Sequence, residues 1–351
     1  MTSVSDRPAI APSAFEPPRH AVDVRPAAAA APSGGVTRRF LERFALIAFA
    51  LYHLPLFLNN YPSLGGGGFN DTGLAVRWGH VFTPAGVWVA HHIFHIAGPM
   101  PNGYRGDNGD VAEEFGRLLL AVVIGLVASL WWTSADRRRP RAPWVPEALR
   151  VLLRYSIALG LASYAIAKLL PMQFPPLRGP ILNQRVGDLT PMALLWSFME
   201  YSRPYAFFGG LMEMTAVLLL CFRRTATLGA LTCLAVMVNV ALLNWAYGVP
   251  VKLYSTMLVV SAAVLLLYDL PRLYAFFVKN APVPASSQVS FVHERIPTRW
   301  RWTIKALLVG SVCLSSVTAM ESALARQPAP SAAVDSTYRL LRAPFHLISV
   351  R

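Results

Sequence analysis

Seven long apolar runs, separated by polar connectors, divide the chain. Each is about 17 to 25 residues long, the length that an α-helix needs to cross the hydrocarbon core of a bilayer. The runs fall at roughly 40–58, 115–133, 149–170, 204–222, 226–246, 251–269 and 303–320. Backbone polar groups in lipid must find their partners within the segment, so runs of this length form helices there. The pattern therefore predicts an all-α, polytopic membrane helix bundle with about seven transmembrane helices.

Two connectors are too long to be simple turns. Residues 59–113 contain four consecutive glycines and an apolar piece too short to span, which we expect to lie at the membrane interface. Residues 171–203 contain five prolines and cannot form one continuous helix. Within them, 191–201 is predicted to form a short helix that begins at Pro191 and is capped by Thr190.

The composition fits lipid as the solvent, since 54% of the residues are hydrophobic and 14% are charged. The net charge is +14, but Arg and Lys gather in alternate connectors rather than along one solvated face, so no nucleic-acid partner is expected. The positive-inside tendency predicts a multi-pass membrane protein with a cytoplasmic N-terminus and an outside C-terminus. Residues 1–36, rich in Ala, Pro and Ser, are expected to be a disordered tail rather than a signal peptide.

A carboxylate, Glu213, stands near the middle of the fourth apolar run. Ionisable groups at such a depth are costly and usually face a bundle interior or a cavity. Arg154 and Lys168 in the third run are fourteen residues apart and share one helical face, with Tyr164 one turn from Lys168. From the expected heights of the two side chains, Glu213 is predicted to pair with Arg154. The alternative is that Arg154 reaches the cytoplasmic interface while Glu213 is protonated or hydrogen-bonded to a neighbouring helix.

A second polar group is expected near the outer ends of the spans, where a pocket would accept an anionic or quinone-like head group. Its members are Lys168, Gln173, Asp188, Asn239, Asn244, Lys252 and Tyr254. The alternative is that the two lysines are interfacial anchors beside aromatic residues. The predicted polar core site comprises Arg154, Tyr164, Lys168, Glu213, Asn239 and Lys252.

An HHxxH string at 91–95 places His91 and His95 one helical turn apart, a spacing that can bring two imidazoles to one metal ion. His53 and His80 are further candidates for such a site. A cluster of interface residues is the favoured alternative, and the glutamate of an HExxH protease is missing because position 92 is His. The three cysteines have neither CxxC nor Cys/His ligand spacing, so neither a disulfide framework nor a zinc site is predicted.

Four stretches carry a resemblance to a known family: RYSIALGLASYAIAKLLPMQFP at 154–175, TPMALLWSFMEYSRPYAFFGGLMEMTAVLLL at 190–220, RRTATLGAL at 223–231 and LNWAYGVPVKLYS at 243–255. With them, the block 154–269 resembles the DoxX-like family of bacterial membrane proteins. WVAHHIF at 88–94 and PNGYRGDNGD at 101–110 extend the resemblance to its longer, multi-span members. Arg154 and Lys168 stand at the family's R...G...K pattern, and Glu213 stands in its G...E helix. Ser163 and Tyr164 depart from the pattern, since a glycine is common there.

The resemblance implies a four-helix core over 149–270. Around this core, the sequence predicts a disordered cytoplasmic tail over 1–36 and a two-span region with an outer loop over 37–133. A cytoplasmic linker is predicted over 271–300, followed by a final span and a short tail over 301–351.

Some DoxX-like proteins are linked to membrane-bound sulfur or thiol oxidation that feeds quinone, so the resemblance implies redox chemistry. The leading hypothesis is an accessory or quinone-facing subunit of a membrane redox system, with the lipid bilayer and a redox protein as partners and a quinone as cofactor. A small-solute or proton-coupled transporter, with Glu213 cycling its proton, is one alternative. A non-enzymatic structural or assembly protein is another. Without an evident covalent catalyst, the sequence leaves open whether the chain is an enzyme.

Overall fold

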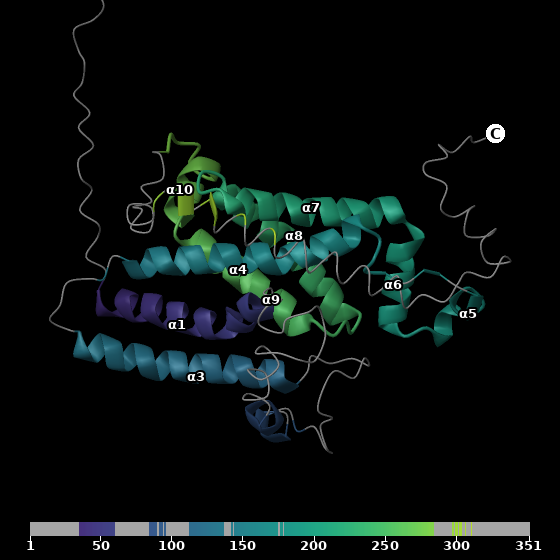
Figure 1. The fold of residues 1–351 in the computed structure, drawn as a ribbon, viewed down its shortest axis with the longest axis horizontal. Helices are drawn as coiled ribbons and strands as arrows, with labels where there is room; N and C mark the ends of the chain where they lie inside the picture. Colours follow the sequence, from purple (N-terminus) through teal and green to yellow (C-terminus); the bar gives the residue numbers. More distant parts are fainter. Residues whose placement is uncertain are drawn as a thin grey trace, which may run out of the picture. The chain divides into compact units, whose positions relative to one another are not determined.

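The computed structural model describes residues 35–59, most of 84–95, 112–136, 142, 144–283 apart from 175 and 178, and a few positions between 297 and 310. Within these ranges the regular elements are helices and no β-strand is present, which confirms the all-α prediction (Figure 1). They are α1 (Val36–Asn59), α3 (Ala112–Ala135), α4 (Trp144–Leu169), α5 (Gly179–Leu182), the 3-10 helix η2 (Val186–Asp188), α6 (Pro191–Tyr201), α7 (Arg203–Cys221), α8 (Ala226–Ala246), α9 (Lys252–Leu267) and α10 (Leu270–Phe277).

Four helices are long and apolar enough to cross a membrane: the stretch Glu114–Ala135 of α3, and the whole of α4, α7 and α8. α9 and α10 pass the same test as a pair, although they are bent by 78° at the break between them. α1 covers the first predicted span, and its first two turns carry four charged residues. The seventh predicted span, 303–320, falls almost wholly outside the described residues. Four candidate spans are therefore established, and the count of seven stays a prediction.

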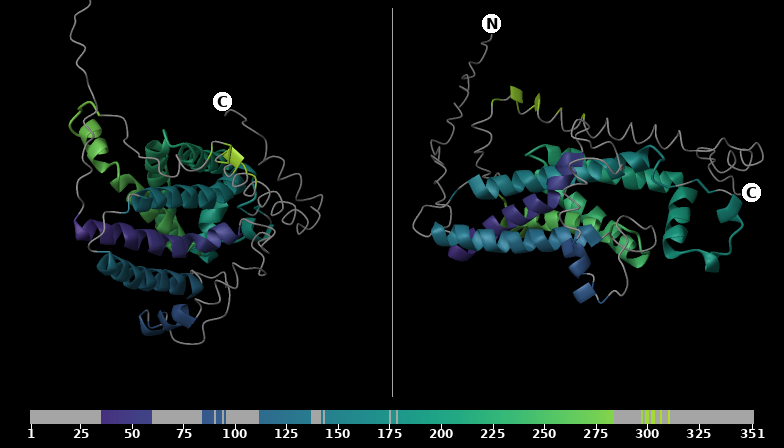
Figure 2. Two further views of the ribbon diagram at one scale, coloured as in Figure 1. Left: turned by 60° about the vertical axis from the view of Figure 1, so that its left-hand side comes forward. Right: turned by 60° about the horizontal axis from the view of Figure 1, so that its bottom comes forward.

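Helices α4, α7, α8 and α9 pack in a closed cycle, in which α4 contacts α7, α7 contacts α8, α8 contacts α9 and α9 returns to α4. α1 packs against α4, and α3 packs against the other side of α1, so these two helices extend the bundle on one flank (Figures 1 and 2). The end where α4 finishes and α7 begins is called the α6 end below, and the opposite end, where α9 finishes, is called the α10 end.

The centre of the bundle is built from side chains with almost no exposure. Leu153, Ile157 and Leu161 recur every four residues along α4 and meet Leu220 of α7 and Leu258 of α9 in one cluster. Lipid tails are as apolar as these side chains, so in a bilayer close van der Waals packing rather than water exclusion would hold the helices together. The alanines at 216, 230 and 262 of the same cluster let the backbones approach closely.

Gly210 lies at a close approach between α4 and α7. A Cβ atom at this position would lie 2.8 Å from Cβ of Lys168 and 3.0 Å from the carbonyl oxygen of Ala165. Both distances are shorter than a normal van der Waals contact, so any larger residue would push the two helices apart. The neighbouring Gly209 is different, because its nearest contact would be at 3.9 Å.

The short helix in the proline-rich connector forms as predicted. α6 begins with Pro191 in its first turn, and Thr190 is its N-cap, since Oγ1 of Thr190 accepts a hydrogen bond from the backbone N–H of Ala193 at 3.2 Å. Proline fits there because its missing N–H would have no partner in the first turn of a helix. α6 contacts α7, which begins two residues later at Arg203.

Residues 270–277, in the region predicted as a linker, form the amphipathic helix α10. Asp269 precedes it and holds the corner together, because its carboxylate accepts hydrogen bonds from Thr227 Oγ1 at 2.6 Å and from Arg272 at 3.2 Å. Pro271 stands in the first turn of α10, where it starts a new helix rather than continuing α9. The apolar pattern does not predict this element, because α10 is only eight residues long and follows directly on the sixth apolar run.

Candidate functional site

The carboxylate of Glu213 pairs with Lys168 of α4, not with Arg154, so the predicted Glu213–Arg154 pair is wrong. Lys168 Nζ donates to Glu213 Oε1, and the two side chains are only 8% and 2% exposed. The carboxylate thus faces the bundle interior, as its depth in the apolar run required. Its second oxygen, Oε2, is buried and has no hydrogen-bond partner among the described residues. Cys233 of α8 is also buried and lies near enough for an electrostatic interaction with this carboxylate.

Arg154 has a different partner, the backbone at the end of α7. Its Nε and Nη2 atoms both donate to the carbonyl oxygen of Leu220, at 3.0 and 2.7 Å. The last carbonyls of a helix have no partner within the helix, and they carry its partial negative charge. Arg154 therefore satisfies an otherwise unpaired group and ties α4 to α7 at the α10 end. This contact is structural, and it removes Arg154 from the predicted binding site.

The other predicted site residues do not gather in one place. Tyr164 of α4 and Tyr254 of α9 are neighbours, with ring centroids 6.1 Å apart. Asn239 is exposed on α8, whereas Asn244, one turn further on, is buried. Lys252 stands half-buried at the start of α9. The structure brings Lys168 to Glu213 and Tyr164 to Tyr254, and leaves Arg154 and Asn239 apart from them.

A second, partly buried polar cluster lies between α1 and α3, near the α6 end. Glu114 and Arg117 of α3 form an ion pair, and Tyr52 Oη of α1 donates to Glu114 Oε2 at 3.4 Å. The guanidinium of Arg117 lies over the Tyr52 ring, 4.9 Å from its centroid. Tyr254 of α9 is within electrostatic range of all three residues. The cluster therefore joins α1 to α3 through charged and hydroxyl groups, with the hydroxyl group of Tyr254 nearby.

His53 adjoins this cluster and is only 1% exposed. Its ring packs edge-on against Tyr52, with centroids 5.1 Å apart, and stacks against Phe49 at 6.0 Å. Its Nε2 atom is 3.2 Å from Oγ of Ser261 on α9. The sequence reading considered His53 only as an addition to a metal site and did not single out Arg117 or Ser261. The signal that it overlooked is a histidine inside an apolar run, which needs a buried partner.

An apolar groove runs along α1, α3 and α9 and has a volume of about 760 Å³. Its walls include Ala45, Ala48 and Phe49 of α1, Leu118, Ala121 and Val122 of α3, and Met257, Val260 and Val264 of α9. Tyr52 lines one end, and Arg38, Glu42 and Arg150 line the other. From Arg38 to Tyr52 the groove follows α1 for about 21 Å, at 1.5 Å per residue. Its volume lies within the range of small-molecule sites, about 300 to 1,000 Å³.

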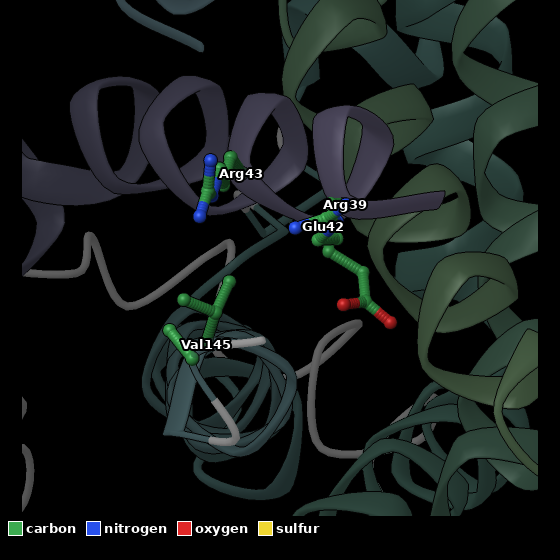
Figure 3. A pocket seen from close by; sticks show the side chains of 5 residues that line it. Arg39, Glu42, Arg43 and Val145 are labelled. Carbon is green, nitrogen blue, oxygen red and sulfur yellow. The ribbon is translucent and has the colours of Figure 1, made fainter. Parts of the chain in front are cut away.

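A smaller pocket lies where the first turns of α1 and α4 meet (Figure 3). It is lined by Arg39, Glu42, Arg43, Ala142 and Val145, and leaves no room for a ligand. Arg43 is instead committed to the fold. It donates to Asp136 at 2.6 Å and to Thr133 at 3.3 Å, and its guanidinium lies 4.5 Å from the centre of the Trp132 ring. This pocket therefore belongs to the packing of α1 against the start of α4, and Arg43 also ties α1 to the end of α3.

The histidine string does not form a metal site in the part of it that the structure describes. His92 is hydrogen-bonded to the carbonyl oxygen of Trp88 at 3.0 Å, and its ring stacks on that indole. His95 has a positive φ of 53° and lies outside the helical segment, so the one-turn spacing with His91 is not realised. The described ranges hold no group of three or more His, Cys, Asp or Glu side chains that could bind a metal ion. His80 lies outside these ranges.

The fold and the site are those of a helical bundle with four candidate membrane spans, buried ion pairs and a lateral apolar groove. The chain belongs to the same family as the uncharacterized protein YwoB of Bacillus subtilis (strain 168). The two are 30% identical over 133 residues, which cover 38% of this chain and 84% of YwoB. No protein-family model matches the chain. No solved structure matches it.

Proposed function

We propose that the chain is a multi-pass protein of the bacterial inner membrane, of the DoxX-like type, that serves as an accessory, quinone-facing subunit of a membrane redox system. The N-terminus would then be cytoplasmic and the C-terminus outside, because Arg and Lys gather in alternate connectors. The four candidate spans support the location in a membrane. The DoxX-like motifs at Arg154, Lys168 and Glu213 support the family.

The observation that carries the quinone hypothesis is the groove and the polar cluster at its end. A membrane quinone has a long apolar tail and a ring that carries oxygen atoms. The walls of the groove suit the tail, and Tyr52 at its end leads to His53, Glu114 and Arg117, which suit the ring. Binding sites of this kind combine apolar walls with a few polar groups that fix orientation. The electrons would be carried by the quinone and by a redox partner, not by protein side chains.

Two matched tryptophan substitutions test this proposal. Val260 lines the groove and is 39% exposed, whereas Val238 on α8 is 40% exposed and does not line it. Val260→Trp should weaken binding of a short-chain quinone to the purified protein in nanodiscs by at least tenfold, because the indole fills the groove. Val238→Trp should leave the affinity unchanged. Absence of quinone binding to the unaltered protein would refute the proposal, and equal loss in both variants would place the binding outside the groove.

A proton-coupled transporter is a second candidate, favoured by Oε2 of Glu213, which has no hydrogen-bond partner among the described residues. A mid-membrane carboxylate with a free oxygen can take up and release a proton while Lys168 holds the other oxygen. Solute uptake into proteoliposomes would then depend on the pH gradient and would be lost in Glu213→Gln. Uptake that ignores both would exclude this function.

A structural or assembly protein is the third candidate, supported by the bond from Arg154 to Leu220 and by the Lys168–Glu213 pair, which join α4 to α7. In that case substitutions at Glu213 would lower the yield of folded protein and affect no binding or uptake activity.

A further inference from the structure

The imidazole of His53 keeps one nitrogen unused. Nδ1 is buried and has no hydrogen-bond partner in the part of the chain that the structure describes. Buried polar atoms are nearly always paired, so an unpaired one calls for an explanation, and one explanation is a ligand. Three residues around His53 line the groove. The rings of Phe49 and Tyr52 contact the imidazole, and the carbonyl oxygen of Met257 accepts a hydrogen bond from Ser261, the residue next to His53 Nε2.

The hydrogen bonds of Ser261 assign the tautomer of His53. The hydroxyl group of Ser261 donates its only proton to the carbonyl oxygen of Met257, at 2.6 Å. Oγ can therefore only accept from His53 Nε2, 3.2 Å away, so in a neutral ring Nε2 carries the proton. It follows that Nδ1 is a bare acceptor. The group that would satisfy it must be a hydrogen-bond donor.

The same cluster also offers an unused donor. Nε of Arg117 is buried and has no partner among the described residues, although Nη2 of the same side chain binds Glu114. The Tyr52 ring touches both side chains, with the guanidinium of Arg117 4.9 Å from its centroid and the His53 ring edge-on at 5.1 Å. Among the described residues, one acceptor and one donor without a hydrogen-bond partner therefore lie next to Tyr52, the residue that ends the groove.

We propose that this cluster selects the reduced, hydroxyl-bearing form of the ring, with His53 Nδ1 accepting a hydrogen bond from a hydroquinone hydroxyl group. This inference rests on the function proposed above and adds the redox state of the ligand. A quinone carbonyl can only accept, so it can use Arg117 Nε but leaves Nδ1 unpaired. A hydroquinone hydroxyl group donates as well as accepts and can satisfy both nitrogens. A phosphodiester or an acyl ester has only acceptors, so neither group would satisfy Nδ1.

The test compares the affinities of decyl-benzohydroquinone and decyl-benzoquinone for the full-length protein in nanodiscs, under anaerobic conditions. The unaltered protein should bind the hydroquinone about fivefold more tightly, as expected for one additional hydrogen bond. His53→Phe keeps a ring between Phe49 and Tyr52 but has no acceptor, so the preference should disappear. The matched control is His92→Phe, which removes an exposed histidine outside the groove. This variant should retain the preference for the hydroquinone.

A second variant covers the case in which His53→Phe does not fold. Ser261→Ala removes the acceptor that holds the proton on Nε2, and the ring can then place its proton on Nδ1. The preference for the hydroquinone should fall in this variant as well. A merely structural role of His53 would leave the ratio of the two affinities unchanged.

The outcomes separate the two proposals. Equal affinity for both forms, tighter binding of the quinone, or a preference that survives in both His53→Phe and Ser261→Ala would overturn the inference. If Val260→Trp still weakens quinone binding at least tenfold and Val238→Trp does not, the quinone-facing function would stand without this inference. Failure of the unaltered protein to bind either form would overturn both.

Discussion

Lys168 of α4 and Glu213 of α7 form a buried ion pair beside a close contact between these two helices. The pair lies beside Gly210, whose missing side chain lets the two backbones meet there. The ion pair and the small residue that lets α4 and α7 approach each other therefore lie at the same place in the bundle.

Removing one member of this pair should be costly. Lys168→Met or Glu213→Gln alone should each destabilise the protein by about 3 kcal/mol, because a buried charge loses its counterion. The double variant should recover most of the loss, since no charge is then left buried. Thermal unfolding in mild detergent measures all three. Lys279→Met at an exposed position is the control. If the double variant lost the sum of the two single losses in stability, the two side chains would not be coupled.

Gly210→Ala should destabilise the bundle by about 1 to 3 kcal/mol, because the new methyl group overlaps Lys168 and forces α4 and α7 apart. The control, Gly209→Ala, changes the same residue type in the same helix, but its methyl group would make only an ordinary van der Waals contact, at 3.9 Å from Cδ of Lys168. It should be neutral or slightly stabilising, because alanine is the better helix former. Unfolding temperatures of the two variants, measured side by side, provide the test. Equal effects would show that the close contact is absent.

Replacing Arg154 should weaken the end of α7. Arg154→Leu leaves the Leu220 carbonyl unpaired and removes a cation from the negative end of the helix. The variant should therefore lower the free energy of unfolding by about 1 to 3 kcal/mol. Arg154→Lys keeps the charge and one donor and should recover part of this. Hydrogen exchange at the last turn of α7 should rise in Arg154→Leu. Exposed Arg224 is the control, and an Arg224→Leu variant with the same effect would argue against a specific cap.

Loss of the α6 cap should loosen the connector between α4 and α7. Thr190→Ala removes the hydrogen bond to Ala193 and should destabilise the first turn of α6 by about 1 kcal/mol. Thr190→Ser keeps the acceptor and serves as the matched control. Limited proteolysis between residues 183 and 195 reports the difference, and equal cleavage of the two variants would contradict the role of the cap.

Much of the fold is readable from local patterns. The length of each apolar run predicts where α1, α3, α4, α7, α8 and α9 lie, to within a few residues at most of their ends. Thr190 followed by Pro191 predicts the start of α6, because both residues act on the first turn alone. These features depend on neighbours in the chain, so the sequence contains what decides them.

The partner of Glu213 depends on how far one helix is displaced along another, which the sequence does not contain. The prediction aligned the ends of the third and fourth spans. In the structure α4 begins at Trp144, five residues before the predicted start at 149, and it runs past the end of α7. This shift brings Arg154 level with Leu220 and leaves the carboxylate to Lys168.

The bond between His53 and Ser261 joins positions 208 residues apart and could not be predicted either. Both residues look like isolated polar positions in apolar runs. Only the packing order of the helices, with α1 beside α4 and α9 returning to α4, places the two on facing surfaces. The same order creates the groove, since its walls bring together residues of α1, α3, α4 and α9 that are far apart in the chain.

The corner at Asp269 decides which way the chain leaves the bundle. α10 turns by 78° from α9, so if α9 crosses the bilayer upright, α10 must run nearly parallel to its surface. Tyr274, Phe276 and Phe277 are exposed there, with Arg272 and Lys279 alongside. Aromatic rings with basic neighbours favour the headgroup layer. This helix would therefore lie in the headgroup region of one leaflet and set how deeply the bundle is placed in the bilayer.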